Sequence, residues 1–350
     1  MAAAGSDLLR RWEQALEGNS RCTPFQRPQW VLPHLESFRD PRLIDLNGGV
    51  APVHIARRNG LRWVRLIGAD YEDIVAVPGR ERECVRDFFA RLNAMRKEWD
   101  LCDFRTMLPD SVVLTAFDNG RCLPELAREL PRCRFALIPH QSYLNVQIPA
   151  DWRSYEAHIG KKLAYQMRAA EGRRNRSFSS NEIRMASAAT LDADVAALIE
   201  LHTRRWEAKG TGGMFKEPGS AERFLDVCRR FLEIGQLRLY TLWLDGRPAS
   251  ALFCLADGRR IYYYASGFDV SHQKHHPTKV LIAQAIKDAI AQGPAVFDFM
   301  KGSEEYKSDW ANAGTQTWRV VIAGPSVRAR LMQRVLGAGP QMNSLRRRGR

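Results

Sequence analysis

The chain has 350 residues, long enough for two domains that each bury a core, and its 45% apolar and 26% charged residues are an ordinary balance for a globular protein. No stretch approaches the ~20 apolar residues of a membrane span, which excludes an integral membrane protein and leaves a soluble or peripheral one. The net charge of +14 is unusual and indicates an anionic partner, such as a nucleotide cofactor, a nucleic acid or an acidic lipid surface, or else a basic surface that only aids solubility.

The cysteines and the N-terminus both favour a cytoplasmic protein. The number of cysteines, seven, is odd, and no pair has CxxC spacing, so neither a zinc site nor a disulfide framework is expected. The segment Met1 to Asp7 lacks the basic start and the apolar core of a secretory signal. We therefore expect reduced, mostly buried thiols, no metal, and a location in the cytoplasm or peripherally at the inner membrane.

The first 138 residues predict a domain of strands and helices. Helices are expected over 8–16, 24–35, 83–98 and 124–130, and strands over 43–46, 53–57, 63–67 and 101–105. Asn59-Gly60 suits a two-residue hairpin turn between the second and third strands. Asp70 and Tyr71 follow a predicted strand end, where loops commonly carry binding groups, so they are candidate substrate-binding residues. A turn with solvated acids is the alternative.

A second domain is expected over residues 139–325, opened by a strand over 142–148 and by a helix that Asp151 can cap. The next stretch, Lys161 to Arg176, is basic and contains a single acid. It can hold the phosphates of a nucleotide, a tRNA or a sugar nucleotide, which makes Lys161 a candidate substrate-binding residue. A solvated basic helix face is the alternative.

Two further helices are expected over 191–208 and 218–232. The first carries His202 and Arg205, which share a face because they lie three residues apart. Both are candidate substrate-binding residues, with a structural role as the alternative for a lone helical histidine.

The stretch from Gln236 to Trp310 organises the chain. Its expected strands cover 237–245, 247–256, 260–266 and 295–300. Asp245-Gly246 and Asp257-Gly258 each suit a two-residue type I′ turn between the first three strands. A helix over 278–292, opened by Pro277, connects the third strand to the fourth. A strand, a crossover helix and a strand in this order predict a parallel pair.

Four segments carry a family resemblance: Leu201–Trp206, Tyr264–Asp269, Pro277 and Phe297–Trp310. With this order of elements, the chain resembles the second half of the GNAT acyltransferase fold. More closely, it resembles acetyltransferases related to CelD-type polysaccharide-biosynthesis proteins and, more distantly, Fem-type peptidoglycan aminoacyltransferases. The likeness covers residues 140–322 well and the first 140 only loosely. Family members usually have Pro-Gly where this chain has Pro277-Thr278.

The resemblance implies a mixed α/β fold of two tandem GNAT-like domains, of which the first is incomplete or divergent. It implies acetyl-CoA or another acyl-CoA as the donor, and strands over 260–266 and 295–300 that part to hold the acyl chain. It also implies that Asp70 and Tyr71 lie on the cleft between the domains. The acceptor would be a polar small molecule or a glycan precursor.

The start of the helix at Thr278 is the expected cofactor site. A helix N-terminus presents unpaired N–H groups and the positive end of the helix dipole, which suits a pyrophosphate. The candidate cofactor-binding residues surround this point: Lys274, His275, His276, Thr278 and Lys279. A solvated loop is the alternative.

The candidate catalytic residues are Asp298, Glu304, Tyr306 and Lys307. Asp298 lies mid-strand between two phenylalanines, and a carboxylate beside aromatic rings can have a raised pKa and act as a general base. Glu304 is a second candidate base. Tyr306 could act as a general acid, and Lys307 as a charge for a thiolate or a substrate phosphate. A structural acceptor for the turn over 301–303 is the alternative role of Asp298.

The C-terminal part is expected to give an edge-like strand over 317–323 and a basic tail over 326–350. From Gly324 onward there is no acid, while arginines accumulate up to the run 346–348. Residues 327–336 could form a basic amphipathic helix that touches an anionic membrane or a partner. A frayed tail is the alternative.

The leading hypothesis is an acyl-CoA-dependent N- or O-acyltransferase that acts on an amine, an amino sugar or a cell-envelope precursor. One rival is Fem-like aminoacyl transfer from tRNA, which would engage the Lys161–Arg176 stretch and the C-terminal arginines. The other is a non-catalytic GNAT-fold interaction module, which the Pro277-Thr278 departure keeps open.

Overall fold

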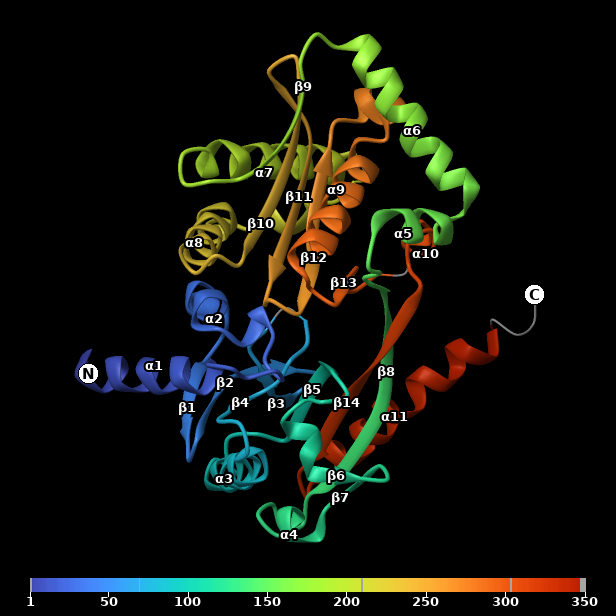
Figure 1. The fold of residues 1–350 in the computed structure, drawn as a ribbon. Helices are drawn as coiled ribbons and strands as arrows, with labels where there is room; N and C mark the ends of the chain where they lie inside the picture. The colour runs from blue at the N-terminus through green and yellow to red at the C-terminus, as the bar shows by residue number, and fades with distance from the viewer. Residues whose placement is uncertain (1, 69, 209, 303, 347–350) are drawn as a thin grey trace. The chain divides into compact units, whose positions relative to one another are not determined.

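The computed structural model describes residues 2–68, 70–208, 210–302 and 304–346 (Figure 1). It separates into two compact units, the first made of Met1–Ser142 with Gln316–Arg350 and the second of Tyr143–Thr315. The expected second domain ran from 139 to 325, whereas here the last strand and the C-terminal helix belong with the first unit. Ser303, Arg347 and Arg348, which the sequence arguments included, lie outside the described residues.

The helices of the first unit largely follow the predicted positions. They are α1 (Ala2–Leu16), α2 (Pro28–His34), α3 (Glu81–Ala94), α4 (Pro124–Ala127) and α11 (Val327–Arg346), with 3-10 turns at Pro24–Gln26, Leu35–Ser37 and Val113–Ala116. The prediction for 124–130 was too long, because beyond α4 the backbone bonds are of the shorter i to i+3 kind. The frayed tail is also wrong, since a helix begins at Val327.

The main sheet of the first unit has the strand order β1-β2-β3-β5-β14-β8. Its strands are β1 (Pro41–Leu46), β2 (Gly49–Arg58), β3 (Leu61–Leu66), β5 (Leu101–Met107), β14 (Ala313–Ala323) and β8 (Arg134–Gln147). β3 and β5 are parallel, while β4 (Val75–Ala76) pairs with β2. β6 (Phe117–Asp118) and β7 (Arg121–Cys122) form a separate two-stranded sheet.

Both faces of this sheet are buried. Val320 and Ile322 of β14 join a core with Phe88 of α3, whereas Val321 and Ala323 join a second core with α11. The expectation of an edge strand over 317–323 is therefore wrong, because β14 lies between β5 and β8 and its consecutive apolar residues 320–323 are buried on both faces.

The helices of the second unit are α5 (Trp152–His158), α6 (Gly160–Ser177), α7 (Leu191–Glu207), α8 (Ser220–Glu233), α9 (Pro277–Gln292) and α10 (Glu305–Ser308). Asp151 caps α5 as predicted, since its carboxylate accepts the Ser154 N–H at 2.8 Å. Across the described residues of both units, none of the helices combines the length and apolar composition needed to cross a membrane.

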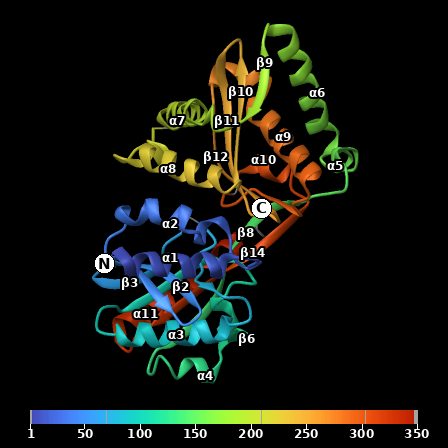
Figure 2. The same ribbon diagram turned by 60° about the vertical axis from the view of Figure 1, so that its left-hand side comes forward.

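The second unit is built in three layers on strands in the order β8-β13-β12-β11-β10-β9. The strands other than β8 are β9 (Asn181–Met185), β10 (Leu237–Leu244), β11 (Arg247–Ala256), β12 (Arg260–Phe268) and β13 (Val296–Asp298). Figures 1 and 2 show α7 and α8 on one side of these strands and α6 and α9 on the other. The side of α6 and α9 buries the apolar residues of both helices against alternate residues of the strands.

The three glycine turns were predicted with partial success. Asn59-Gly60 and Asp245-Gly246 have positive φ at both residues, as a type I′ turn requires. Between β11 and β12, however, the connection is the three-residue loop 257–259, and only Gly258 has positive φ. Asp257 stabilises this wider turn because its Oδ1 accepts the N–H groups of Arg259 and Arg260.

Candidate active site

β12 and β13 pair over a short length and then part. Three residue pairs are in parallel register: Arg260–Val296, Ile261–Phe297 and Tyr262–Asp298. β13 ends at Asp298, whereas β12 continues to Phe268. The parallel pair and the opening between its strands are therefore present as expected, and the opening begins at Tyr263.

A bulge in β12 coincides with this opening. The antiparallel register against β11 shifts between Phe253, which pairs with Ala265, and Cys254, which pairs with Tyr263. Tyr264 is the extra residue. A bulge bends its strand and re-aims the neighbouring side chains. The bend therefore lies where β12 loses its β13 neighbour.

The chain enters α9 through a residue in the left-handed region. His276 has φ 46° and ψ 49°, directly before Pro277 at the first helical position. Non-glycine residues rarely adopt this conformation, and such residues cluster at ligand sites. The His276 side chain does not cap the helix. The first-turn N–H groups of Thr278 and Lys279 consequently point out of α9 without a partner from their N-cap.

A cavity of about 160 Å³ joins the start of α9 to the opening beside β12. Five of its lining residues are sequence candidates: Arg205, His276, Thr278, Lys279 and Tyr306. The others are Tyr263, Phe268, Gln273, Pro277 and Ile282. Residues from α7, β12, the α9 entry and α10 thus meet around one space.

The cationic groups of this cavity are held in place by neighbours. Lys279 Nζ donates a hydrogen bond to Gln166 Oε1 of α6 at 2.8 Å. The Arg205 guanidinium lies 5.0 Å from the centre of the Phe268 ring, within the range of a cation–π contact. Burial lowers the pKa of Lys279 although the Asp309 charge raises it in part, and burial with the Lys279 and Arg173 charges lowers the pKa of His276. An anion in the cavity would relieve that mutual repulsion.

The other two cofactor candidates do not line the cavity. The Lys274 side chain is exposed, and its backbone carbonyl accepts a hydrogen bond from Arg173. His275 is buried, with its ring 5.2 Å from that of Phe178. These contacts give both residues a place in the packing of α6 against the α9 entry.

A row of hydroxyl groups ends at the cavity. Tyr306 Oη donates to Tyr263 Oη at 3.3 Å, and Tyr263 Oη lies 2.6 Å from Ser266 Oγ. Burial raises the pKa of Tyr306 well above the ordinary value of a phenol and also raises the pKa of Tyr263, so both are protonated at neutral pH. Tyr306 is therefore a proton donor in its resting state.

Glu304 and Lys307 pair with each other beside this row. Lys307 is buried, and its Nζ lies 2.9 Å from Glu304 Oε2 and 2.7 Å from the carbonyl oxygen of Lys301. Partial burial raises the pKa of Glu304, but the hydrogen bond and charge of Lys307, a backbone hydrogen bond and the Arg205 charge together lower it below its usual value. A Cβ at Gly302, where φ is 125°, would lie 2.1 Å from Glu304 Oε2. The pair and the glycine together fix the turn that leads into α10.

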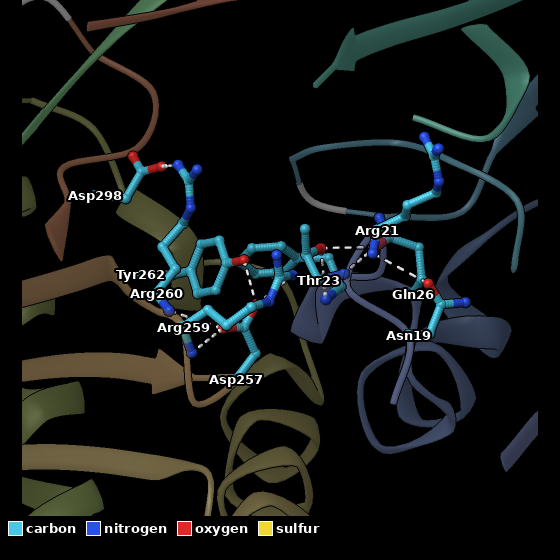
Figure 3. Close-up of polar contacts among 10 residues, drawn as sticks. Asn19, Arg21, Thr23, Gln26, Asp257, Arg259, Arg260, Tyr262 and Asp298 are labelled. Atoms are coloured by element: carbon cyan, nitrogen blue, oxygen red, sulfur yellow. Dashed lines mark hydrogen bonds and ion pairs between the residues drawn. The ribbon is translucent and has the colours of Figure 1, made fainter. Parts of the chain in front are cut away.

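Asp298 is fully buried, and both of its carboxylate oxygens have partners; Figure 3 shows the contact with Arg260. Its Oδ2 lies 2.6 Å from Arg260 Nη1, and its Oδ1 accepts the Met300 N–H at 2.7 Å. The neighbouring Tyr262 hydroxyl donates to Asp257 at 2.7 Å. These contacts favour the structural alternative for Asp298, which ties β13 to β12 and shapes the chain that follows.

The remaining candidates lie apart from the cavity lining. His202 is buried against Trp206 and Phe215, and burial with the Arg205 charge lowers its pKa to about 4. Lys161 is exposed on α6. Asp70 and Tyr71 are buried in the first unit, so the solvated turn is wrong, while their role in substrate binding stays a prediction.

Sequence reasoning missed Tyr263, Phe268 and Gln273. Tyr263 stands in a run of three tyrosines, and strand alternation alone cannot say which of them faces a site. The bulge at Tyr264 further breaks the alternation. Among the described residues, no group of three or more His, Cys, Asp or Glu side chains is placed to hold a metal ion.

Residues 164–308 match a family described as the acetyltransferase (GNAT) domain. All the residues that line the cavity fall within this range. The second unit therefore contains a GNAT-type domain over this range, with α9 and the parted strands in the order that the resemblance implied. A search among curated proteins finds no match.

Solved structures share their fold with most of the chain, beyond the range of the family match. A structure of FemX has a TM-score of 0.60 at 10% identity and covers 93% of this chain and 97% of its own. The C-terminal domain of a protein described as a lysylphosphatidylglycerol synthetase, from Agrobacterium fabrum, has a TM-score of 0.56 at 11% identity, covering 94% of this chain and 95% of its own. A conserved protein of unknown function from Bacteroides thetaiotaomicron has a TM-score of 0.56 at 10% identity, covering 91% and 97%.

At such low identity these structures show a shared fold and nothing of the substrate. The fold is the mixed α/β, double-GNAT arrangement of the Fem-like type, as the sequence predicted. The family match adds acyl transfer as the general class of reaction.

Proposed function

We propose that the second unit transfers an acyl group from an acyl-CoA to an amine or hydroxyl of a polar acceptor, such as an amino sugar or a cell-envelope precursor. The observation that carries this proposal is the cavity that joins the first turn of α9 to the edge of β12. It offers N–H donors and a cation at one end and a proton donor at the other.

The residues of the cavity suit the parts of an acyl-CoA. A pyrophosphate would accept hydrogen bonds from the Thr278 and Lys279 N–H groups and pair with the Lys279 ammonium. The β12 edge beyond Tyr262, which has no β13 partner, would pair with the amides of the pantetheine arm. This arrangement leads the thioester towards Tyr306.

Tyr306 is the general acid of the proposed reaction. The acceptor nitrogen or oxygen attacks the thioester carbonyl carbon, and the C–S bond breaks as the new bond forms. The Tyr306 hydroxyl gives its proton to the departing thiolate. The acceptor loses one proton when the new bond forms, so the number of protons on the enzyme is restored when Tyr306 is protonated again. The hydroxyls of Tyr263 and Ser266 hold the phenol in position and offer a route by which its proton returns.

A charge placed at residue 278 tests the cofactor site. Thr278→Asp puts a carboxylate in the first turn of α9, where it stabilises the helix but repels a pyrophosphate. Thr278→Asn has nearly the same size without the charge. Calorimetric titration with acetyl-CoA should show saturable binding for the wild type and the Asn variant, and at least about tenfold weaker binding for the Asp variant.

Two results would overturn the proposal. One is the absence of binding to acetyl-CoA and to longer acyl-CoAs by the wild type. The other is equal binding by both variants, which would remove the site from α9. Thermal unfolding of each variant checks that the Asp substitution leaves the fold intact.

Aminoacyl transfer from tRNA is the second candidate, and one observation favours it. The α6 helix carries Lys161, Lys162, Arg168 and Arg176 as exposed side chains, more positive charge than one CoA requires. Arg168 is already paired with Glu156 at 2.6 Å, so the free excess is smaller than the sequence suggests. We therefore rank acyl-CoA first.

A further inference from the structure

The C-terminal helix α11 exposes an apolar stripe. Val327, Leu331 and Val335 follow one another at four-residue spacing, with exposed fractions of 81%, 60% and 59%. They are three of the seven large apolar side chains that are exposed among the described residues. Residues four apart lie on one face of a helix, so the three form a continuous stripe.

The stripe is not the face by which α11 packs on the first unit. The opposite face of α11 is docked on the first unit through Ala329 and Gln333, both buried. Gln333 Nε2 donates to the carbonyl oxygens of Arg134 and Val321 at 2.8 and 2.9 Å. Met332 and Leu336 pack on the same core. The helix is therefore held in one orientation, with the stripe directed outward.

The charge around the stripe has one sign. Arg328 and Arg334 are exposed beside it, and Arg330 is half-buried with its guanidinium on the Arg132 carbonyl. The sequence has no acid from Gly324 to its end, and four more arginines follow at 346, 347, 348 and 350. Every charged residue from Gly324 to the end of the sequence is thus a cation, and an apolar stripe beside such residues matches an anionic surface that also has an apolar layer.

We propose that α11 docks the protein on an anionic phospholipid bilayer. The three aliphatic side chains enter the boundary between headgroups and acyl chains, and the arginines contact the lipid phosphates. A nucleic acid would engage the arginines but would leave the stripe in water. The stripe is too small to hold the protein on a neutral bilayer by itself, so both features are needed.

The test uses the full chain and vesicles of phosphatidylglycerol and phosphatidylcholine, compared with vesicles of phosphatidylcholine alone. Cosedimentation should show binding to the anionic vesicles only. Anionic vesicles attract any strongly basic protein, including one with a net charge of +14, so the decisive variants leave the net charge unchanged. Leu331→Gln with Val327→Gln should weaken binding at least about tenfold, whereas Ile234→Gln, an exposed residue directly after α8, should not change it.

The charge requirement has its own matched pair. Arg328→Gln with Arg334→Gln should weaken binding clearly more than Arg247→Gln with Lys287→Gln, which removes the same charge from exposed positions of the second unit. Unfolding midpoints of all variants should stay near that of the wild type, because the replaced side chains are exposed.

Several outcomes would overturn the proposal. They are no binding to anionic vesicles, equal binding to neutral ones, or unchanged binding by the stripe variants. A concentration-dependent dimer that the stripe variants abolish would show that a second copy covers the stripe instead. None of these outcomes bears on acetyl-CoA binding, since α11 shares no residue with the cavity.

Discussion

At the scale of single residues, Asp298 and Tyr306 stand close in sequence but differ in what surrounds them. Asp298 has an arginine on one oxygen and a backbone N–H on the other, while Tyr306 lines a cavity with its hydroxyl at the end of a donor row. Removal of one partner from a buried ion pair strongly destabilises the fold, because the remaining charge is left buried without compensation. The two residues therefore predict different kinds of defect.

Asp298→Asn should lower the free energy of unfolding by about 3 kcal/mol, as expected for breaking a buried ion pair. The measurement is urea unfolding, combined with Arg260→Gln in a double-mutant cycle that gives the coupling between the two side chains. Asp226→Asn is the control. It breaks an exposed pair with Arg230 and should cost less than about 0.5 kcal/mol.

A large loss of turnover by Asp298→Asn at unchanged stability would contradict this structural role. It would return Asp298 to the position of general base that its place between two phenylalanines suggested.

Tyr306→Phe removes one hydroxyl and no packing. If Tyr306 protonates the thiolate, turnover with an acyl-CoA should fall by about 100-fold or more, with little change in acetyl-CoA affinity. Tyr262→Phe is the control, since the Tyr262 hydroxyl donates to Asp257 and Tyr262 does not line the cavity. Because burial raises the pKa of Tyr306, the wild type should keep its activity through mildly alkaline pH and lose it only as the phenol ionises.

A matched loss of affinity and turnover would instead make Tyr306 a binding residue. Unchanged kinetics would remove it from the mechanism.

At the scale of elements, the close approach of β12 to α7 depends on a glycine. A Cβ at Gly267 would lie 2.5 Å from the backbone nitrogen of His202 and 2.7 Å from the carbonyl carbon of Leu201. Both atoms are backbone and cannot move aside alone. Gly267 thus sets the distance between the strand that borders the cavity and the helix that supplies Arg205.

Gly267→Ala should destabilise the second unit by about 1–3 kcal/mol and weaken acetyl-CoA binding through the displaced Arg205. Gly314→Ala provides the comparison, because it is also a strand glycine and its Cβ would meet only an ordinary contact at 3.5 Å. It should change stability by less than about 0.5 kcal/mol. Equal melting temperatures for the two variants would refute the argument from backbone contact.

Element order was predictable where local chemistry is strong. The helix over 278–292 and its flanking strands followed from Pro277, helical spacing and β-branched runs, and the structure has all three. β9 was missed because Asn181–Met185 offers little apolar periodicity and lies at the edge of its sheet with side chains partly exposed. The interior place of β14 depends on pairing with β5, far away in sequence, which no local pattern reveals.

The candidate site was predictable only in part for the same reason. Residues at a helix start, such as Thr278 and Lys279, can be recognised from their position in the sequence. Tyr263 and Phe268 do not, because their facing depends on the bulge at Tyr264 and on where β13 ends. The pairing of Asp298 with Arg260 could not be predicted either, since the two residues lie 38 positions apart in sequence and meet only through the pairing of β12 with β13.

At the scale of the whole molecule, the two candidate donors differ in how much of the net charge of +14 they would contact. An acyl-CoA occupies one local cradle. A tRNA would lie along many cations, and each neutralised phosphate contributes about −0.9 to the slope of log affinity against log salt for duplex regions. Salt dependence therefore separates the two candidates more clearly than affinity does.

We predict that acetyl-CoA binding weakens by about 3- to 12-fold between about 50 and about 200 mM salt, because only one or two phosphates are neutralised. If tRNA is the donor, engagement of three or more phosphates would lower its affinity at least about 40-fold over the same range. Lys161→Gln with Lys162→Gln should then flatten the tRNA slope, while Arg247→Gln with Lys287→Gln, an equal change of charge, should leave it unaltered. If both pairs of substitutions reduce a steep tRNA salt slope equally, the slope reflects general attraction to a basic protein. If the tRNA slope is shallow while acetyl-CoA binds tightly with weak salt dependence, acyl-CoA is the donor.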